Sequence, residues 1–186
     1  MSQIKVNSII PVAGVPTGGG GGIIQIKSTN VTSASSVSFT NTNLFATPAT
    51  VTITSVAANS KFIISGQIAG ESNANDHTVG FVLRRVISGS TSSINVGDGS
   101  GNRSPVSFMM NMGWYNQDNN TTPSSMALSP YLDSPNQAAG TAITYKIDGL
   151  GCGDGGTFYF GRSVDDNNDS SHERLPNYIT VMEVSA

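Results

Sequence analysis

The sequence predicts an all-β protein: a two-sheet antiparallel β-sandwich of jelly-roll type, preceded by an extended N-terminal arm. Three observations favour this fold. Strand-like segments recur at intervals of roughly 8–16 residues, with turn-forming residues between them. No segment shows the apolar spacing of an amphipathic helix of useful length. No internal repeat of fixed period is found, which argues against a propeller or a β-helix.

Residues 1–16 form the first predicted element, the extended arm. Its apolar side chains are Ile4, Val6, Ile9, Ile10, Val12 and Val15. Pro11 and Pro16 interrupt them, and because proline lacks an N–H and fixes φ, the arm should not be helical. An exposed apolar segment is typical of docking, and we expect this arm to dock onto another chain. The alternative is a first edge strand that folds back onto its own domain.

Residues 17–22 consist of a threonine and five consecutive glycines. Ordering such a run costs much backbone entropy, so the sequence predicts a flexible hinge here. A phosphate-binding loop is the alternative, but the Lys-Ser/Thr pair that would close it is missing. The chain is therefore expected to comprise an arm (1–16), a hinge (17–22) and one β-sandwich head domain (23–186).

The strands of the head are predicted from alternating apolar and polar residues and from β-branched or aromatic runs. In chain order they are 24–27, 36–40, 51–54, 61–69, 78–87, 92–96, 106–112, 125–132, 142–148, 157–160 and 177–184. Gly66 is expected to mark a β-bulge in the fourth of these strands. The clearest half-buried strand is 142–148, with Ile143, Tyr145 and Ile147 on one face.

The last predicted strand, 177–184, is apolar on both faces. Tyr178, Met182 and Val184 share one face, and Ile179 and Val181 share the other. Such a strand is expected in the centre of a sheet, covered by a second layer or by another subunit. Several other strands share this property, so we expect identical copies to bury apolar surface between them. A homotrimer is the usual arrangement for such heads, although cyclic symmetry also allows a dimer or a larger ring.

The composition excludes several classes of partner. Only 11% of the residues are charged, against roughly 25% in average soluble domains, while 37% are hydrophobic. The nine Lys and Arg residues are scattered and the net charge is −3, so the clustered basic face of a nucleic-acid-binding protein is lacking. No apolar run approaches the roughly 20 residues of a membrane span, and no signal peptide opens the sequence. We therefore expect synthesis in a host cytoplasm without export or membrane insertion.

The first 22 residues and the second half of the sequence carry short motifs that resemble those of one class of proteins. MSQIKVNSIIPVAG leads into the glycine-rich linker, and the second half contains LDSP at 132–135, TYK at 144–146 and TVME at 180–183. In these features the chain resembles structural proteins of tailed bacteriophages, marine and cyanobacterial ones in particular. The resemblance implies a non-enzymatic virion component, a tail fibre or a particle-surface fibre, that docks through its arm onto another virion protein. A capsid decoration protein and a carbohydrate-binding module are the alternatives.

A loop after the predicted strand 106–112 combines aromatic and amide side chains. Trp114, Tyr115, Asn116 and Gln117 lie there. Because aromatic faces stack on sugar rings while amides bind hydroxyl groups, this loop is the best candidate for a surface that contacts a host glycan. The alternative is that Trp114 is buried beneath its own loop.

Four acidic residues precede the last strand in a loop rich in Asn and Ser, and the candidate ligands among them are Asp165, Asp166 and Asp169. Since Ca²⁺ binds several oxygen ligands, these carboxylates would be its ligands if the loop formed a site. The glycine and glutamate positions of an EF-hand loop are absent, and a solvated polar loop is the default interpretation. We predict no metal and no other cofactor.

No catalytic motif is found. Residues 151–156 match the letters of a dinucleotide-binding motif, but the predicted strand 157–160 follows instead of a helix, so a glycine-rich hairpin loop is expected. His77 and His172 lack partners at zinc-site spacing. The single cysteine, Cys152, cannot form an internal disulfide. We predict that the protein is not an enzyme.

Overall fold

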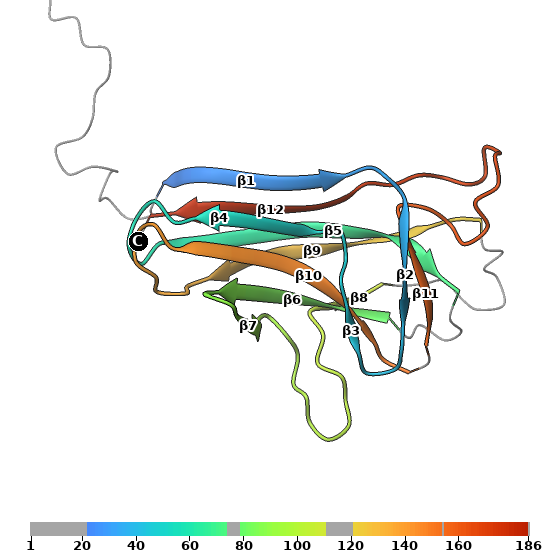
Figure 1. The fold of residues 1–186 in the computed structure, drawn as a ribbon, viewed down its shortest axis with the longest axis horizontal. Helices are drawn as coiled ribbons and strands as arrows, with labels where there is room; N and C mark the ends of the chain where they lie inside the picture. Colours follow the sequence, from blue (N-terminus) through green and yellow to red (C-terminus); the bar gives the residue numbers. More distant parts are fainter. Residues whose placement is uncertain (1–21, 74–78, 111–120, 154, 186) are drawn as a thin grey trace, which may run out of the picture.

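The computed structural model describes residues 22–73, 79–110, 121–153 and 155–185, and these residues form strands and loops without a helix (Figure 1). Within them there is accordingly no helix that could cross a membrane. Sheet A contains β1 (Ile23–Val31), β2 (Ser35–Phe39), β5 (Lys61–Ser72), β9 (Ser124–Asp133), β11 (Gly156–Phe160) and β12 (Asn177–Val184). Sheet B contains β3 (Leu44–Phe45), β4 (Thr50–Thr54), β6 (Val79–Ile87), β7 (Ser90–Ser93), β8 (Phe108–Met109) and β10 (Ala142–Gly151). The predicted antiparallel β-sandwich is confirmed.

The pairing of the strands has the jelly-roll arrangement. β1 pairs with β12, β4 with β10, β5 with β9 and β6 with β7, all antiparallel. These pairs are successive parts of one long hairpin whose tip is the β6–β7 turn. Because β12 also pairs with β5 and β10 also pairs with β6, the hairpin is rolled into two packed sheets. β2 and β11 extend sheet A, and β3 and β8 are short additions to sheet B.

β5 is the central strand of sheet A. One of its edges pairs with β12 and then with β11, and the other edge pairs with β9. The register against β9 shifts between Ile64 and Gly66, where the sequence predicts a bulge. At Gly66 a Cβ atom would lie 2.8 Å from the Tyr178 carbonyl oxygen and 2.9 Å from Ile147 Cδ1. The glycine therefore permits close packing of β5 against β12 and the opposite sheet.

The closing strand, β12, lies between β1 and β5, as its sequence predicts. Ile179 and Val181 face the core and are fully buried. Tyr178, Met182 and Val184 face outward and remain partly exposed. Within the described residues, one apolar face of β12 is therefore covered and the other is partly exposed.

The core between the sheets is rich in aromatic side chains. Phe158 lies at its centre, with ring-centroid distances of 4.8 Å to Phe160, 5.6 Å to Phe81 and 6.4 Å to Phe45. Burial of each such ring stabilises the fold by roughly 1.5–3 kcal/mol. The other core side chains are Phe39, Ala49, Val51, Ile53, Phe62, Ile64, Ile68, Val79, Leu83, Met110, Leu128, Ile143, Tyr145, Ile147, Ile179 and Val181.

Two expected elements differ in the structure. β7 begins at Ser90, earlier than the predicted strand 92–96, because Ser88 and Gly89 form a two-residue turn with φ of 49° and 81°. The expected hairpin loop at 151–156 is wrong, because β10 lies in sheet B and β11 lies in sheet A, and the two strands do not pair. The glycine-rich segment instead connects the two sheets.

Candidate functional site

The outer face of sheet A carries a row of large apolar side chains in direct register. Ile26 of β1 pairs with Met182 of β12, Met182 with Ile63 of β5, and Ile63 with Leu132 of β9. Their chain neighbours, such as Phe62, Val181 and Asp133, are buried on the inner side, so these four side chains point outward. Ile26 is 55% exposed and Leu132 is 52% exposed. We call these four residues the apolar row.

On one side of the row the neighbouring position is Lys61 of β5, which is exposed, and on the other side the neighbouring positions are neutral. Ser28, Thr180 and Ser65 form the next row, and the Ser28 and Thr180 hydroxyl oxygens lie 2.9 Å apart. Asn30, Tyr178 and Gln67 form the row after that. Contiguous apolar patches on a protein surface usually mark sites of contact with another chain or ligand. These three rows carry no charged side chain, which marks the face as a contact surface.

The far end of this face is covered by residues 161–176, the loop between β11 and β12. Ala69 and Glu71 of β5 point outward there, yet they are 0% and 2% exposed. The Gly161 N–H donates to the Ala69 carbonyl oxygen at 2.8 Å, and the Val164 N–H donates to Glu71 Oε2 at 2.6 Å. In Figure 1 this loop lies at the end of the sheet opposite the start of β1. The loop therefore confines the open part of the face to the end that carries the apolar row.

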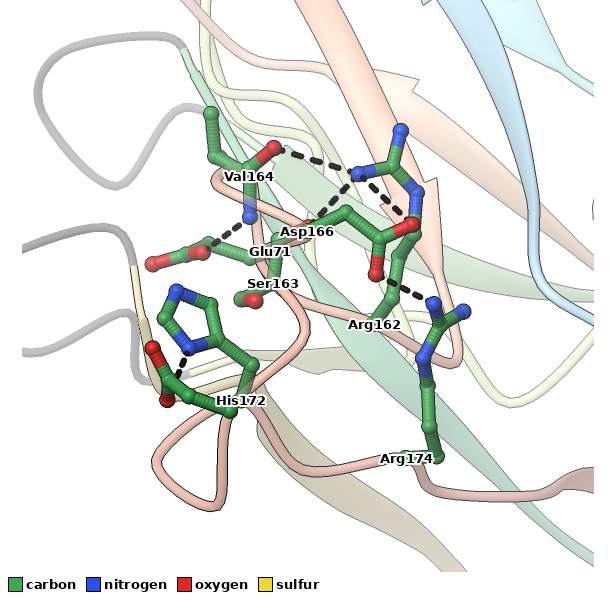
Figure 2. Close-up of polar contacts among 8 residues, drawn as sticks. Glu71, Arg162, Ser163, Val164, Asp166, His172 and Arg174 are labelled. Carbon is green, nitrogen blue, oxygen red and sulfur yellow. Dashed lines mark hydrogen bonds and ion pairs between the residues drawn. The ribbon is translucent and has the colours of Figure 1, made fainter.

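Asp166, one of the three candidate calcium ligands, is paired with two arginines in this loop. Arg174 Nη2 donates to one carboxylate oxygen, and Arg162 Nη1 lies 3.9 Å from the other (Figure 2). Arg162 also donates to the Ser163 and Val164 carbonyl oxygens at 3.0 and 3.1 Å. A cation that bound Asp166 would therefore have to displace the Arg162 and Arg174 side chains from its carboxylate.

The other two predicted ligands lie apart from this network. Asp169 accepts hydrogen bonds from Ser171 and lies 2.8 Å from His172 Nδ1. Bonds from the Ser171 hydroxyl, from His172 and from the Ser171 N–H lower the pKa of Asp169 to about 2. Asp165 is exposed. Among the described residues no three His, Cys, Asp or Glu side chains converge as metal ligands, and the calcium site stays an untested alternative to the predicted solvated loop.

Two buried polar side chains in this loop are not apparent from the sequence. Ser163 is fully buried, and the side chain of His172 is 4% exposed. Ser163 Oγ and His172 Nε2 have no hydrogen-bond partner in the described part of the chain (Figure 2). A serine nucleophile requires a hydrogen bond to its histidine base and access for a substrate. Within the described residues Ser163 is buried and makes no hydrogen bond to His172.

The other predicted sites lie outside the described residues. They are the arm residues Ile4, Val6, Ile9, Ile10 and Val12, the loop residues Trp114, Tyr115, Asn116 and Gln117, and His77. The docking and glycan hypotheses for these residues stay predictions.

No family model and no curated protein matches the sequence. Among solved structures, the chain is similar to a protein in the structure of the infectious bursal disease virus Gt strain, with 14% identity and a TM-score of 0.35. This match covers 88% of the chain and 37% of the viral chain, so the chain spans little more than a third of that protein. It is also similar to Eiger TNF from S. frugiperda, with 9% identity, a TM-score of 0.30, and 82% and 92% of the two chains covered. Similarity this weak does not assign a function.

Proposed function

We propose that the protein is a non-enzymatic structural component of a bacteriophage virion, a tail fibre or a particle-surface fibre. Its N-terminal arm docks onto another virion protein, and its jelly-roll head assembles with copies of itself, as a homotrimer, and contacts the host surface. The observation that carries this proposal is the apolar row beside neutral hydroxyl and amide rows on the outer face of sheet A, because a contiguous exposed apolar patch marks an interaction surface.

The electrostatics of the head favour assembly over catalysis. The buried acidic groups are used structurally: Asp133 accepts hydrogen bonds from Arg85, and Asp148 lies 2.8 Å from Lys146 Nζ. Acidic catalysts, in contrast, face a pocket that a substrate can enter. The neutral hydroxyl and amide rows beside the apolar row add hydrogen-bonding groups without the desolvation penalty of charges.

Labelling of purified particles tests the proposal. An antibody against the head should bind intact virions, and cryo-microscopy should place the density on the tail or on the capsid. Density on the capsid lattice would favour a decoration protein. Detection of the protein in infected cells but not in purified particles would overturn the virion assignment. If a variant lacking residues 1–22 is incorporated as well as the full chain, the docking role of the arm is wrong.

A further inference from the structure

The apolar row is open in the described part of the chain, and it lies close to the point where the arm is attached. Gly22 is the first described residue, and its carbonyl oxygen accepts a hydrogen bond of 3.3 Å from the Ser185 N–H. Gly22 is therefore held beside the end of β12. Ile26 is four residues further along β1, which is about 13 Å in a strand. The arm thus starts at the edge of the open face.

The arm is long enough to reach the row. Residues 13–21 lie between Val12 and Gly22 and are rich in glycine. A flexible segment of this length has a root-mean-square span of about 16 Å, close to the distance from Gly22 to the row. When the span of a tether matches the distance to a binding site, the tethered segment has an effective concentration at that site in the millimolar range. This favours contact with the row of the same chain over contact with another copy.

The arm and the row also agree in size and chemistry. Four adjacent strands place the outer members of the row about 14 Å apart, and residues 9–12 in extended form span about 13 Å. In an extended segment Ile10 and Val12 point to the same side, as do Ile4 and Val6. The arm carries one charged side chain, Lys5, and the three rows of the face carry none, while Lys61 lies exposed beside the apolar row. An apolar, nearly uncharged segment can cover this surface without burying an unpaired charge.

The open face is small for two heads that meet face to face. Four strands and about 20 Å of strand length give roughly 400 Å², whereas a stable interface buries roughly 800 Å² on each partner. A tethered extended segment can bind with a smaller buried area, because the tether already holds it near the face. The size of the face therefore favours the arm over a second head as the occupant in the isolated protein.

We propose that residues 1–16 pack across the apolar row of their own chain and keep it covered until the arm engages another protein. The proposal rests on the proposed function in taking the arm as a docking segment, and it adds a control on assembly. When the arm leaves for its virion partner, the row becomes available as one part of a larger contact with a neighbouring head. Arm docking and head assembly are then coupled, and free chains do not associate prematurely.

Hydrogen exchange with mass spectrometry on the full-length chain tests this proposal. The amides of residues 1–12 should exchange more slowly than those of an unstructured peptide, to the same degree at low and high protein concentration. Ile26→Asp and Leu132→Asp should each accelerate this exchange about tenfold or more, since each places a charge in the apolar contact. Leu44→Asp is the matched control, because Leu44 is 42% exposed on β3 of the other sheet. It should leave the arm protected.

Ile10→Asp changes the arm alone, so it provides a test that does not depend on folding of the head variants. It should also accelerate exchange of the arm. Exchange of the wild-type arm at the rate of an unstructured peptide would overturn the proposal. Protection that survives Ile26→Asp and Leu132→Asp would do the same, as would protection that increases with protein concentration, which indicates another copy as the occupant. These results concern the isolated chain, so they are independent of whether the protein is found in virions.

Discussion

Glu183 on the closing strand accepts hydrogen bonds from the backbone N–H of Val56, at 2.9 Å to Oε1 and 3.0 Å to Oε2. The Ala57 N–H donates to the same carboxylate at 3.2 Å, and the Gln25 amide nitrogen donates to Oε2. Glu183 is fully buried on the inner face of β12. The carboxylate therefore ties the β4–β5 loop to the last strand of sheet A and satisfies backbone donors that would otherwise be buried without partners.

Glu183→Gln is expected to reduce stability by about 1–3 kcal/mol at neutral pH, because an amide replaces a carboxylate acceptor of several hydrogen bonds. Urea unfolding followed by circular dichroism measures this. Thr180→Gln, at an outward position of the same strand, is the control and should have a small effect. Equal stability of the wild type and Glu183→Gln at neutral pH would contradict the role assigned to the carboxylate.

The contribution of Glu183 should also depend on pH. Burial raises the pKa of this carboxyl, but hydrogen bonds from Ser60, Gln25, Ala57 and Val56 outweigh it, so the pKa lies below the ordinary value of 4.5. A carboxyl with a lowered folded-state pKa stabilises the fold above its unfolded-state pKa, and this contribution is lost as pH falls through the folded-state value. The difference between the wild type and Glu183→Gln should therefore shrink below pH 4.5. A difference that stays constant through the acid range would contradict this.

Alternation along the strands made the faces of β12 predictable, because successive side chains of a strand point to opposite sides. Ile179 and Val181 share one face and Tyr178, Met182 and Val184 share the other, as the pattern predicts, but only the first face is buried among the described residues. The sequence also predicts apolar surface beyond what one core can bury. It did not predict that this surface forms one row, because the row depends on the register of four strands that are far apart in the chain.

The features missed in the sequence are those with weak periodic signals. β3 is two residues long, Leu44–Phe45, which is too short to show alternation. β7 is exposed at all four positions and has no apolar pattern, since its pairing with β6 is set by the turn at Ser88 and Gly89. The burial of His172 depends on how the 161–176 loop folds over sheet A, and no local spacing encodes that path.

Gly149→Ala is expected to destabilise the fold by about 1–3 kcal/mol through overpacking. Gly149 of β10 pairs with Phe45 of β3, and a Cβ atom at Gly149 would lie 2.0 Å from Phe45 Cζ. The ring therefore occupies the place of the missing side chain. In a Phe45→Leu background the same Gly149→Ala change should cost less, because the smaller side chain leaves room. Thermal unfolding of the four variants of this cycle measures the coupling, and additive effects would contradict direct contact.

Calcium is expected to leave the thermal midpoint of the wild type unchanged. Asp166 is already paired with Arg162 and Arg174, and Asp169 is bonded to Ser171 and His172. The two carboxylates therefore have different partners and do not act together as ligands of one cation. Thermal unfolding with millimolar CaCl₂ and with EDTA measures this. A midpoint that rises with calcium in the wild type, but not in Asp166→Asn, would contradict this and establish the alternative calcium site.

Asp133→Ala is expected to be the most damaging of these polar substitutions, with a loss of about 3–5 kcal/mol, because it leaves a partly buried guanidinium without its counter-charge. Asp133 is 4% exposed and accepts bonds from Arg85 Nη1 at 2.7 and 2.9 Å and from the Tyr145 hydroxyl at 2.7 Å. Burial, together with the hydrogen bond to Asp133, raises the pKa of Tyr145. Tyr145→Phe removes one hydrogen bond and keeps the Arg85–Asp133 pair, so it should cost about 1 kcal/mol. Urea unfolding of both variants measures the two losses, and equal losses would show that the ion pair contributes no more than the phenol.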